Sequence, residues 1–212
     1  MRIVKDADDR KNEILDIAQR LFHEKGYMQT TVEDIMKECR IAKGTLYYHF
    51  KSKEDILSAM IDRQIDRQEE TLKCIAQDTS ITAVEKLIRV IRLLSHKARV
   101  TNGLCEQENP QLHQKSFTRT LFRFTPAMTA IVEEGIKSGE FSTPYPRESV
   151  ELLFCASQLH DPSVFQWMDE EYHRRKKAFF WMLELTLGIS PDAKKQLYQL
   201  AGLPTEPEAD RQ

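Results

Sequence analysis

The segment TTVEDIMKECRIAKGTLYYHFKSKEDIL, from Thr30 to Leu57, carries the most informative pattern in this chain of 212 residues. It predicts a short helix that ends near Cys39 and a second short helix from about Lys43 to His49, with a break at residues 40–42 between them. Two short helices joined by a turn of about three to four residues are typical of a helix-turn-helix.

Hydroxyl and carboxylate residues three positions apart mark the starts of helices in this segment, as in a capping box. The first short helix begins with one of two pairs, Thr30 with Glu33 or Thr31 with Asp34. The residues alone leave both pairings open. Further on, SKED at residues 52–55 has the same pattern and begins a long helix.

The second short helix has an apolar side and a polar side. Leu46 and Phe50 lie four residues apart and are expected in the core. Simple packing of the paired tyrosines is the plainer alternative, but the capping boxes and the turn around them favour a contact surface. The side chains that then project outward or sideways are Lys43, Thr45, Tyr47, Tyr48 and His49.

The charge of this segment differs from that of the whole chain. The formal net charge of the chain is -2, yet every charged residue from Cys39 to Lys53 is basic: Arg40, Lys43, Lys51 and Lys53. A positive surface is therefore expected at this segment and not over the whole protein. The second helix of a helix-turn-helix enters the major groove of DNA, where lysines, hydroxyls and backbone amides bind phosphates. The segment predicts a binding site for double-stranded DNA.

The same segment, with ILDIAQRLFHEKGY before it, resembles the amino-terminal DNA-binding domain of the TetR family of bacterial transcriptional repressors. The resemblance covers Ile14 to Leu57, and EEGIKSGEFS resembles the stretch that leads into the family's last pair of helices. It implies a small helix-turn-helix domain and a larger helical domain that binds a ligand and dimerises. By position it implies that Thr31 and Lys43 contact the DNA backbone and that Lys53 contacts a phosphate, with an added phosphate contact from Arg40. It also implies that Gly44 lets the protein backbone approach the DNA closely. The recognition helix would bear Thr45, Tyr47, Tyr48 and His49.

Two residues of the turn depart from the family pattern. The family commonly has glycine where Arg40 stands and serine or threonine where Ala42 stands. A left-handed conformation at Arg40 costs on the order of 1 kcal/mol, and Ala42 has no side-chain oxygen to cap the following helix. We therefore expect a somewhat strained turn.

The predicted fold class is all-α, because few glycines and prolines interrupt the chain and no proline precedes Pro110. The predicted domains are a helix-turn-helix domain at 1–53, a regulatory and dimerisation domain at 54–203 and a disordered tail at 204–212. The remaining predicted helices are about Asp9–Lys25, Ser52–Ala76, Thr82–Ala98, Gln111–Ser116, Phe117–Ser138, Glu148–His160, Ser163–Leu187 and Pro191–Ala201.

Composition sets further limits. No apolar run approaches the roughly 18 residues of a membrane span, and the first residues lack the apolar segment of a signal peptide. We therefore expect a cytoplasmic protein. The four cysteines are widely spaced without a CxxC pair, which suits reduced thiols. Neither a metal site nor a cofactor is predicted.

The resemblance implies a cavity in the larger domain for a small apolar or amphipathic effector. Apolar residues would line the cavity and a few polar ones would orient the ligand. The same residues also fit a solid core, and the protein would then regulate DNA without a small-molecule input. The candidates are Leu94, Phe117, Leu121, Phe124, Met128, Phe154 and Trp167, with His96, His113 and Gln158 as polar residues.

The last two long helices carry more apolar residues than one buried stripe accommodates. We expect them to pack with their symmetry mates as a four-helix bundle, so that the protein is a homodimer that reads two half-sites. The interface candidates are Leu153, Ala156, Phe165, Met168, Tyr172, Phe179 and Leu183.

An enzyme is the rival class of protein. The chain has no G-x-S-x-G, GxGxxG, P-loop or H-E-x-x-H motif. A catalytic site would require His96, Cys105, His113 and His160 to converge in the larger domain. We predict that the protein is not an enzyme.

Overall fold

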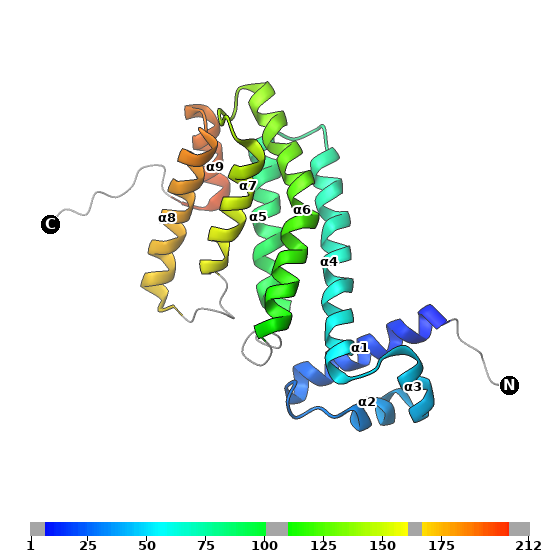
Figure 1. The fold of residues 1–212 in the computed structure, drawn as a ribbon. Coiled ribbons are helices and arrows are strands. Elements are labelled where there is room, and N and C mark those ends of the chain that lie inside the picture. Colours follow the sequence, from blue (N-terminus) through cyan, green and yellow to red (C-terminus); the bar gives the residue numbers. More distant parts are fainter. Residues whose placement is uncertain (1–6, 101–109, 161–166, 204–212) are drawn as a thin grey trace. The chain divides into compact units, whose positions relative to one another are not determined.

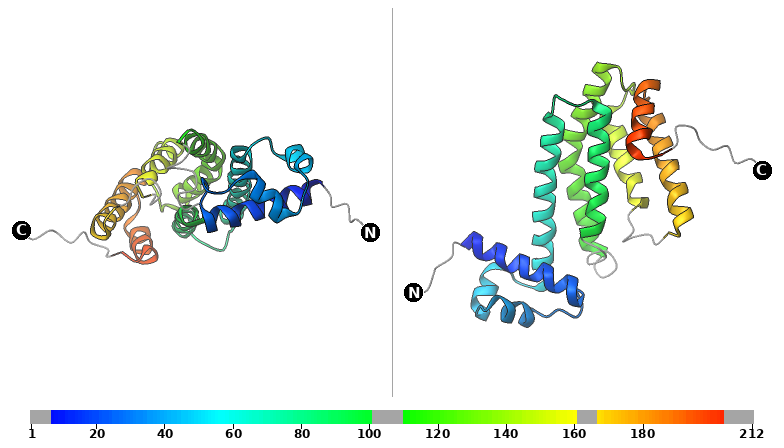
Figure 2. Two further views of the ribbon diagram at one scale, coloured as in Figure 1. Left: turned by 90° about the horizontal axis from the view of Figure 1, so that it is seen from below. Right: turned by 180° about the vertical axis from the view of Figure 1, so that it is seen from behind.

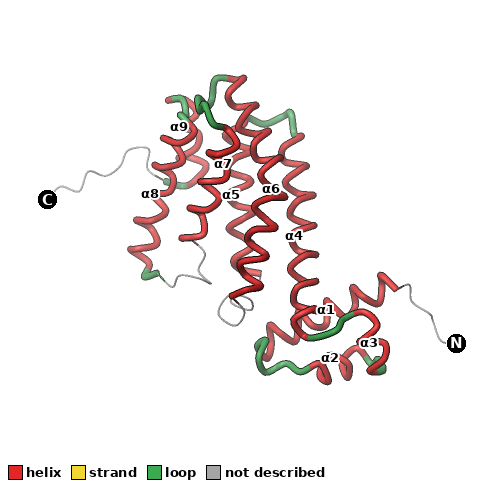
Figure 3. The backbone as a smooth tube through the Cα atoms, viewed as in Figure 1, coloured by secondary structure: helices red, strands yellow, loops and turns green. Residues whose placement is uncertain are grey.

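The structure is a computed structural model, and all regular secondary structure within its described residues is helical (Figure 3). The all-α prediction is confirmed. Within the described residues, no helix combines the length and the apolarity that a membrane crossing requires. The described residues are 7–100, 110–160 and 167–203, so the predicted tail at 204–212 lies outside them.

The chain divides into two compact units, and the division falls inside one long helix, α4 (Lys53–Gln77). The first unit ends at Asp66 within α4, whereas the domain boundary predicted from the sequence lies at residue 53, where the helix starts. A short stretch of described residues, 110–116, also belongs to the first unit. All other described residues from Arg67 onward form the second unit.

In the first unit, three helices precede α4: α1 (Ala7–Lys25), α2 (Val32–Cys39) and α3 (Lys43–His49) (Figure 1). Leu46 and Phe50 are buried, as predicted. Because α1 packs against α2, its apolar stripe also faces the core. The buried residues of that stripe are Ile14, Leu15, Ala18, Leu21 and Phe22.

The second unit contains α5 (Ala83–Val100) and α9 (Pro191–Ala201) packed together, and α7 (Pro146–Ser157) and α8 (Asp169–Leu187) packed together (Figure 2). The predicted pair of helices at 111–116 and 117–138 is wrong, because the structure has one continuous helix there. No proline or glycine interrupts residues 111–125, so nothing in the chain stops the helix at Ser116. This continuous helix is α6 (Pro110–Ser138), and the 3-10 helix η1 (Gln158–His160) follows α7.

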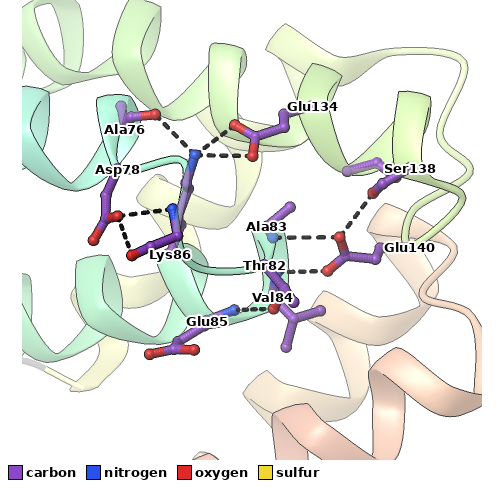
Figure 4. A network of polar contacts seen from close by, with 12 residues as sticks. Ala76, Asp78, Thr82, Ala83, Val84, Glu85, Lys86, Glu134, Ser138 and Glu140 are labelled. Atoms are coloured by element: carbon purple, nitrogen blue, oxygen red, sulfur yellow. Dashed lines mark hydrogen bonds and ion pairs between the residues drawn. The ribbon is translucent and has the colours of Figure 1, made fainter.

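Polar contacts join the ends of three helices in the second unit (Figure 4). The ammonium group of Lys86 on α5 donates to both carboxylate oxygens of Glu134 on α6, at 2.8 and 2.6 Å. It also donates to the carbonyl oxygen of Ala76 in the last turn of α4, at 3.0 Å. After α6, the Glu140 carboxylate accepts a bond from the Val84 amide at the start of α5, at 2.9 Å. The bonds at Ala76 and Val84 satisfy main-chain groups that helix ends leave unpaired.

Candidate DNA-binding site

Thr31 begins α2, which decides between the two pairings that the sequence left open. Its hydroxyl accepts a bond from the Asp34 amide at 3.1 Å, and the Asp34 carboxylate accepts one from the Thr31 amide at 3.0 Å. The Thr31 amide and the Thr31 hydroxyl, which also donates to this carboxylate at 2.9 Å, hold the pKa of the Asp34 carboxyl below its usual range. Thr30 is instead fully buried, and its hydroxyl donates to the carbonyl oxygen of Gly26 at 2.8 Å. Thr31, in contrast, is exposed at the amino terminus of α2.

The turn between α2 and α3 has the strained form predicted from its residues. Arg40 has φ 52° and ψ 44°, a left-handed conformation. Among the described residues it is the one non-glycine with positive φ. The Ile41 amide donates to the Met36 carbonyl oxygen at 3.1 Å, which closes the end of α2. Ala42 precedes α3 without a side-chain capping bond, as predicted.

Helix α3 places its polar and apolar residues on different sides. Tyr48 is 78% exposed and Tyr47 is 42% exposed, whereas the adjacent Leu46 is fully buried. The Lys43 ammonium lies 5.8 Å from the centre of the Tyr47 ring, one helical turn away. The His49 ring packs edge to face against that of Tyr48, at 5.0 Å. The exposed side of α3 is thus aromatic, basic and free of carboxylates.

Gly44 in α3 is not required by the fold. Its backbone is not in the left-handed region, and a Cβ atom there would meet no protein atom within 4 Å. A glycine inside a helix costs about 1 kcal/mol relative to alanine. A glycine at this exposed position leaves room for the close approach of a partner, and its contact with DNA stays a prediction.

Lys53 differs from the other predicted contact residues because its ammonium group is engaged inside the first unit. It donates to the carbonyl oxygens of Tyr27 at 2.8 Å and Thr30 at 3.0 Å. The same group lies 4.3 Å from the centre of the Tyr27 ring. Sequence reasoning missed Tyr27 and the loop around it, because main-chain acceptors leave no trace in the residue types.

The candidate pocket residues lie on several elements of the chain, and their joint role as a pocket stays a prediction. Phe117 on α6 and Phe154 on α7 pack with ring centres 5.5 Å apart. Phe124 is fully buried. The Arg175 guanidinium lies over the Trp167 ring, 3.5 Å from the centre of that ring. Leu94, Leu121, Met128 and Gln158 are partly buried, while the side chains of His96 and His113 lie outside the described part of the structure.

Two of the predicted interface residues belong to the core of a single chain. Leu153 and Leu183 are buried inside the second unit, because α7 packs against α8. Three further apolar residues of these helices are more than half exposed: Leu152 on α7, and Trp181 and Leu185 on α8. Of the remaining candidates, Met168 and Tyr172 are exposed, Ala156 and Phe179 are partly buried, and Phe165 lies outside the described residues.

The capped α2, the left-handed turn and the exposed face of α3 define a helix-turn-helix protein. Comparison with known proteins agrees. Residues 14–60 match the model of the bacterial regulatory proteins of the tetR family. Residues 96–181 match the model of the Tetracyclin repressor-like, C-terminal domain.

Two relatives that are matched over most of their length extend this likeness. The fatty acid metabolism regulator protein of Bacillus subtilis is 32% identical over 176 residues, which cover 76% of this chain and 85% of that protein. The transcriptional repressor KstR2 of Mycolicibacterium smegmatis is 30% identical over 156 residues, covering 68% of this chain and 72% of that one. This chain therefore belongs to the TetR family, and it is a DNA-binding transcriptional regulator rather than an enzyme.

Solved structures share the fold. The crystal structure of the regulator FadR from Bacillus subtilis in complex with stearoyl-CoA has a TM-score of 0.59 and 26% identity, covering 84% of this chain and 99% of that one. A transcriptional regulator from Cytophaga hutchinsonii has a TM-score of 0.68 with 21% identity, covering 84% of this chain and 96% of that one.

Proposed function

We propose that the protein is a cytoplasmic, homodimeric repressor that binds a palindromic operator and leaves it when a long-chain acyl thioester binds the second unit. The observation that carries the DNA-binding half is the exposed, carboxylate-free face of α3, which follows a capped α2. In a dimer, each α3 enters the major groove of one half-site, and the half-sites lie one helical turn or a multiple apart.

Each contact residue has a role that its chemistry suits. Thr31 and Lys43 bind the DNA backbone, and the exposed Arg40 adds a charge beside them. Thr45, Tyr47, Tyr48 and His49 reach base edges or the phosphates that flank them. Gly44 allows the backbone of α3 to approach the duplex.

The exposed apolar residues of α7 and α8 support the dimer. Leu152, Trp181 and Leu185 lie on the outer sides of two helices that already pack against each other. Large apolar side chains in such a position are typical of an interface between proteins. A second copy of the same helices would cover them in a symmetric four-helix bundle.

The effector class rests on relatives. The fatty acid metabolism regulator of Bacillus subtilis matches most of this chain, and FadR from the same organism was crystallised with stearoyl-CoA. Helix α4 belongs to both units, so a ligand bound in the second unit can act on the first through one continuous helix. The ligand must favour the conformation that binds DNA poorly, and by linkage DNA must weaken ligand binding equally.

The test uses a duplex selected from a random library by the purified protein. Stearoyl-CoA below its micelle concentration is expected to weaken binding at least tenfold, a coupling of about 1.4 kcal/mol, whereas CoA alone has no effect. Sedimentation velocity should give a dimer. Tight DNA binding that stearoyl-CoA leaves unchanged would exclude this effector class. A protein that stays monomeric at micromolar concentration would contradict the homodimer.

Tyr48 and Leu46 make a matched pair that separates DNA contact from core packing. Tyr48→Ala is expected to lose about 1–3 kcal/mol of binding to the selected duplex, because the exposed ring contacts DNA, while its melting temperature stays unchanged. Leu46→Ala removes a fully buried side chain and is expected to destabilise the protein by about 2–5 kcal/mol. Normal DNA binding by Tyr48→Ala, with a lowered melting temperature, would assign the tyrosine to packing.

A further inference from the structure

Lys53 lies where a lysine is electrostatically unfavourable. It is the first residue of α4, and a helix amino terminus carries partial positive charge. Its neighbours Glu54 and Asp55 have the negative charge that suits this position. The Lys53 side chain is also partly buried, so its ammonium group has lost some of its hydration. A compensating set of acceptors is therefore required.

The acceptors are three main-chain carbonyl groups of one loop. The Lys53 ammonium donates to Tyr27 at 2.8 Å, to Thr30 at 3.0 Å and to Met28 at 3.4 Å. The Tyr27 ring, 4.3 Å away, adds a cation–π contact. An ammonium group has three N–H donors, and these three carbonyls occupy all of them. A phosphate could bind Lys53 only by replacing these acceptors.

The loop that Lys53 holds, residues 26–30, connects α1 to α2. The Thr30 side chain secures it from within, by donating to the carbonyl oxygens of Leu21 at 3.2 Å and Gly26 at 2.8 Å. Lys53 binds the carbonyl groups that this hydroxyl does not reach. Thr31 follows directly and forms the amino-terminal cap of α2. The position of Lys53 therefore fixes where α2 starts.

We propose that Lys53 is a positioning residue for DNA binding, which fixes the loop at 26–30 and the start of α2 instead of binding a phosphate. It ties the first residue of α4 to the helix-turn-helix. Its role thus differs from the phosphate contact that its position in the family implies.

The first test compares Lys53→Met, which keeps the apolar stem, with Lys43→Met, which removes a proposed backbone contact. Binding of the selected duplex is measured as a function of KCl concentration. Lys43→Met should reduce the log–log salt slope by roughly 0.9, the value for one phosphate contact in duplex DNA. Lys53→Met should weaken binding at least tenfold with the wild-type slope. A slope reduced by roughly 0.9 in Lys53→Met, or unchanged affinity, would overturn the proposal.

A second measurement uses the unaltered protein, so it does not depend on how well the variant folds. In protein labelled with 13C-lysine, the Tyr27 ring current should shift the ε-methylene signal of Lys53 away from those of exposed lysines. This shift should persist in the DNA complex. A signal that returns to the ordinary lysine position on DNA binding would mean that Lys53 leaves the loop for a phosphate, and the proposal would fail.

Hydrogen exchange separates positioning from general stability. In Lys53→Met, the amides of residues 27–31 should exchange faster at temperatures where the far-ultraviolet circular dichroism is that of the folded protein. Amides in the centre of α1 should keep their exchange rates. Equal acceleration throughout the first unit would indicate global destabilisation and would overturn the positioning role.

Discussion

Replacing Glu134 with alanine is expected to lower the free energy of unfolding of the second unit by about 3 kcal/mol. The Lys86 side chain is 1% exposed, and its ammonium group has two hydrogen-bond partners, the Glu134 carboxylate and the Ala76 carbonyl oxygen (Figure 4). Without Glu134 a buried positive charge keeps a single neutral acceptor. Burial of an unpaired charge is among the most costly changes that one substitution can make.

Lys86→Met is the matched control, because it removes the buried charge and keeps a side chain of similar length. Glu134 is 43% exposed, so water can hydrate its carboxylate once the lysine is gone. We expect this variant to lose only about 1 kcal/mol, mainly for the hydrogen bond to Ala76. Urea unfolding can be followed by tryptophan fluorescence, since Trp167 and Trp181 both belong to the second unit. Equal losses of unfolding free energy in Glu134→Ala and Lys86→Met would contradict the prediction that leaving the buried lysine unpaired costs more than removing it.

The helix-turn-helix could be predicted from sequence because its determinants are local. The Thr31 cap, the left-handed Arg40 and the apolar pair Leu46 and Phe50 each depend on neighbours within a few residues along the chain. Helical periodicity and capping chemistry operate over that same range. The structure therefore agrees with this part of the prediction, and it adds that Thr31, not Thr30, caps α2.

Features that depend on distant residues could not be predicted in the same way. Lys86 and Glu134 are 48 positions apart, and in the sequence each looks like an ordinary polar residue on an amphipathic helix. The sequence predicts Leu153 and Leu183 at a partner interface, whereas both are buried within a single chain, because the apolar surplus of α7 and α8 does not reveal which side of a helix turns inward. That side is set when the two helices pack against each other.

Gly135 and Phe141 show a further contact that only the folded chain reveals. Gly135 lies in the last turns of α6, and after the helix ends the chain returns over it. The Phe141 amide donates to the Gly135 carbonyl oxygen at 3.0 Å, and the Phe141 ring is buried. A methyl group added at position 135 would overlap this ring. The glycine therefore provides the space that the aromatic side chain occupies.

A double-mutant cycle tests this contact. Phe141→Ala is expected to cost about 3–5 kcal/mol, because it removes a buried ring and leaves a cavity. Gly135→Ala should cost about 1–3 kcal/mol through overpacking, although the same change in an exposed helix would be stabilising. The double variant should lose less than the sum by about 1 kcal/mol or more, since the new methyl group enters space that the ring has left. Unfolding of all four proteins in urea gives the coupling. If Gly135→Ala is neutral or stabilising, or the two losses simply add, the ring does not depend on the glycine.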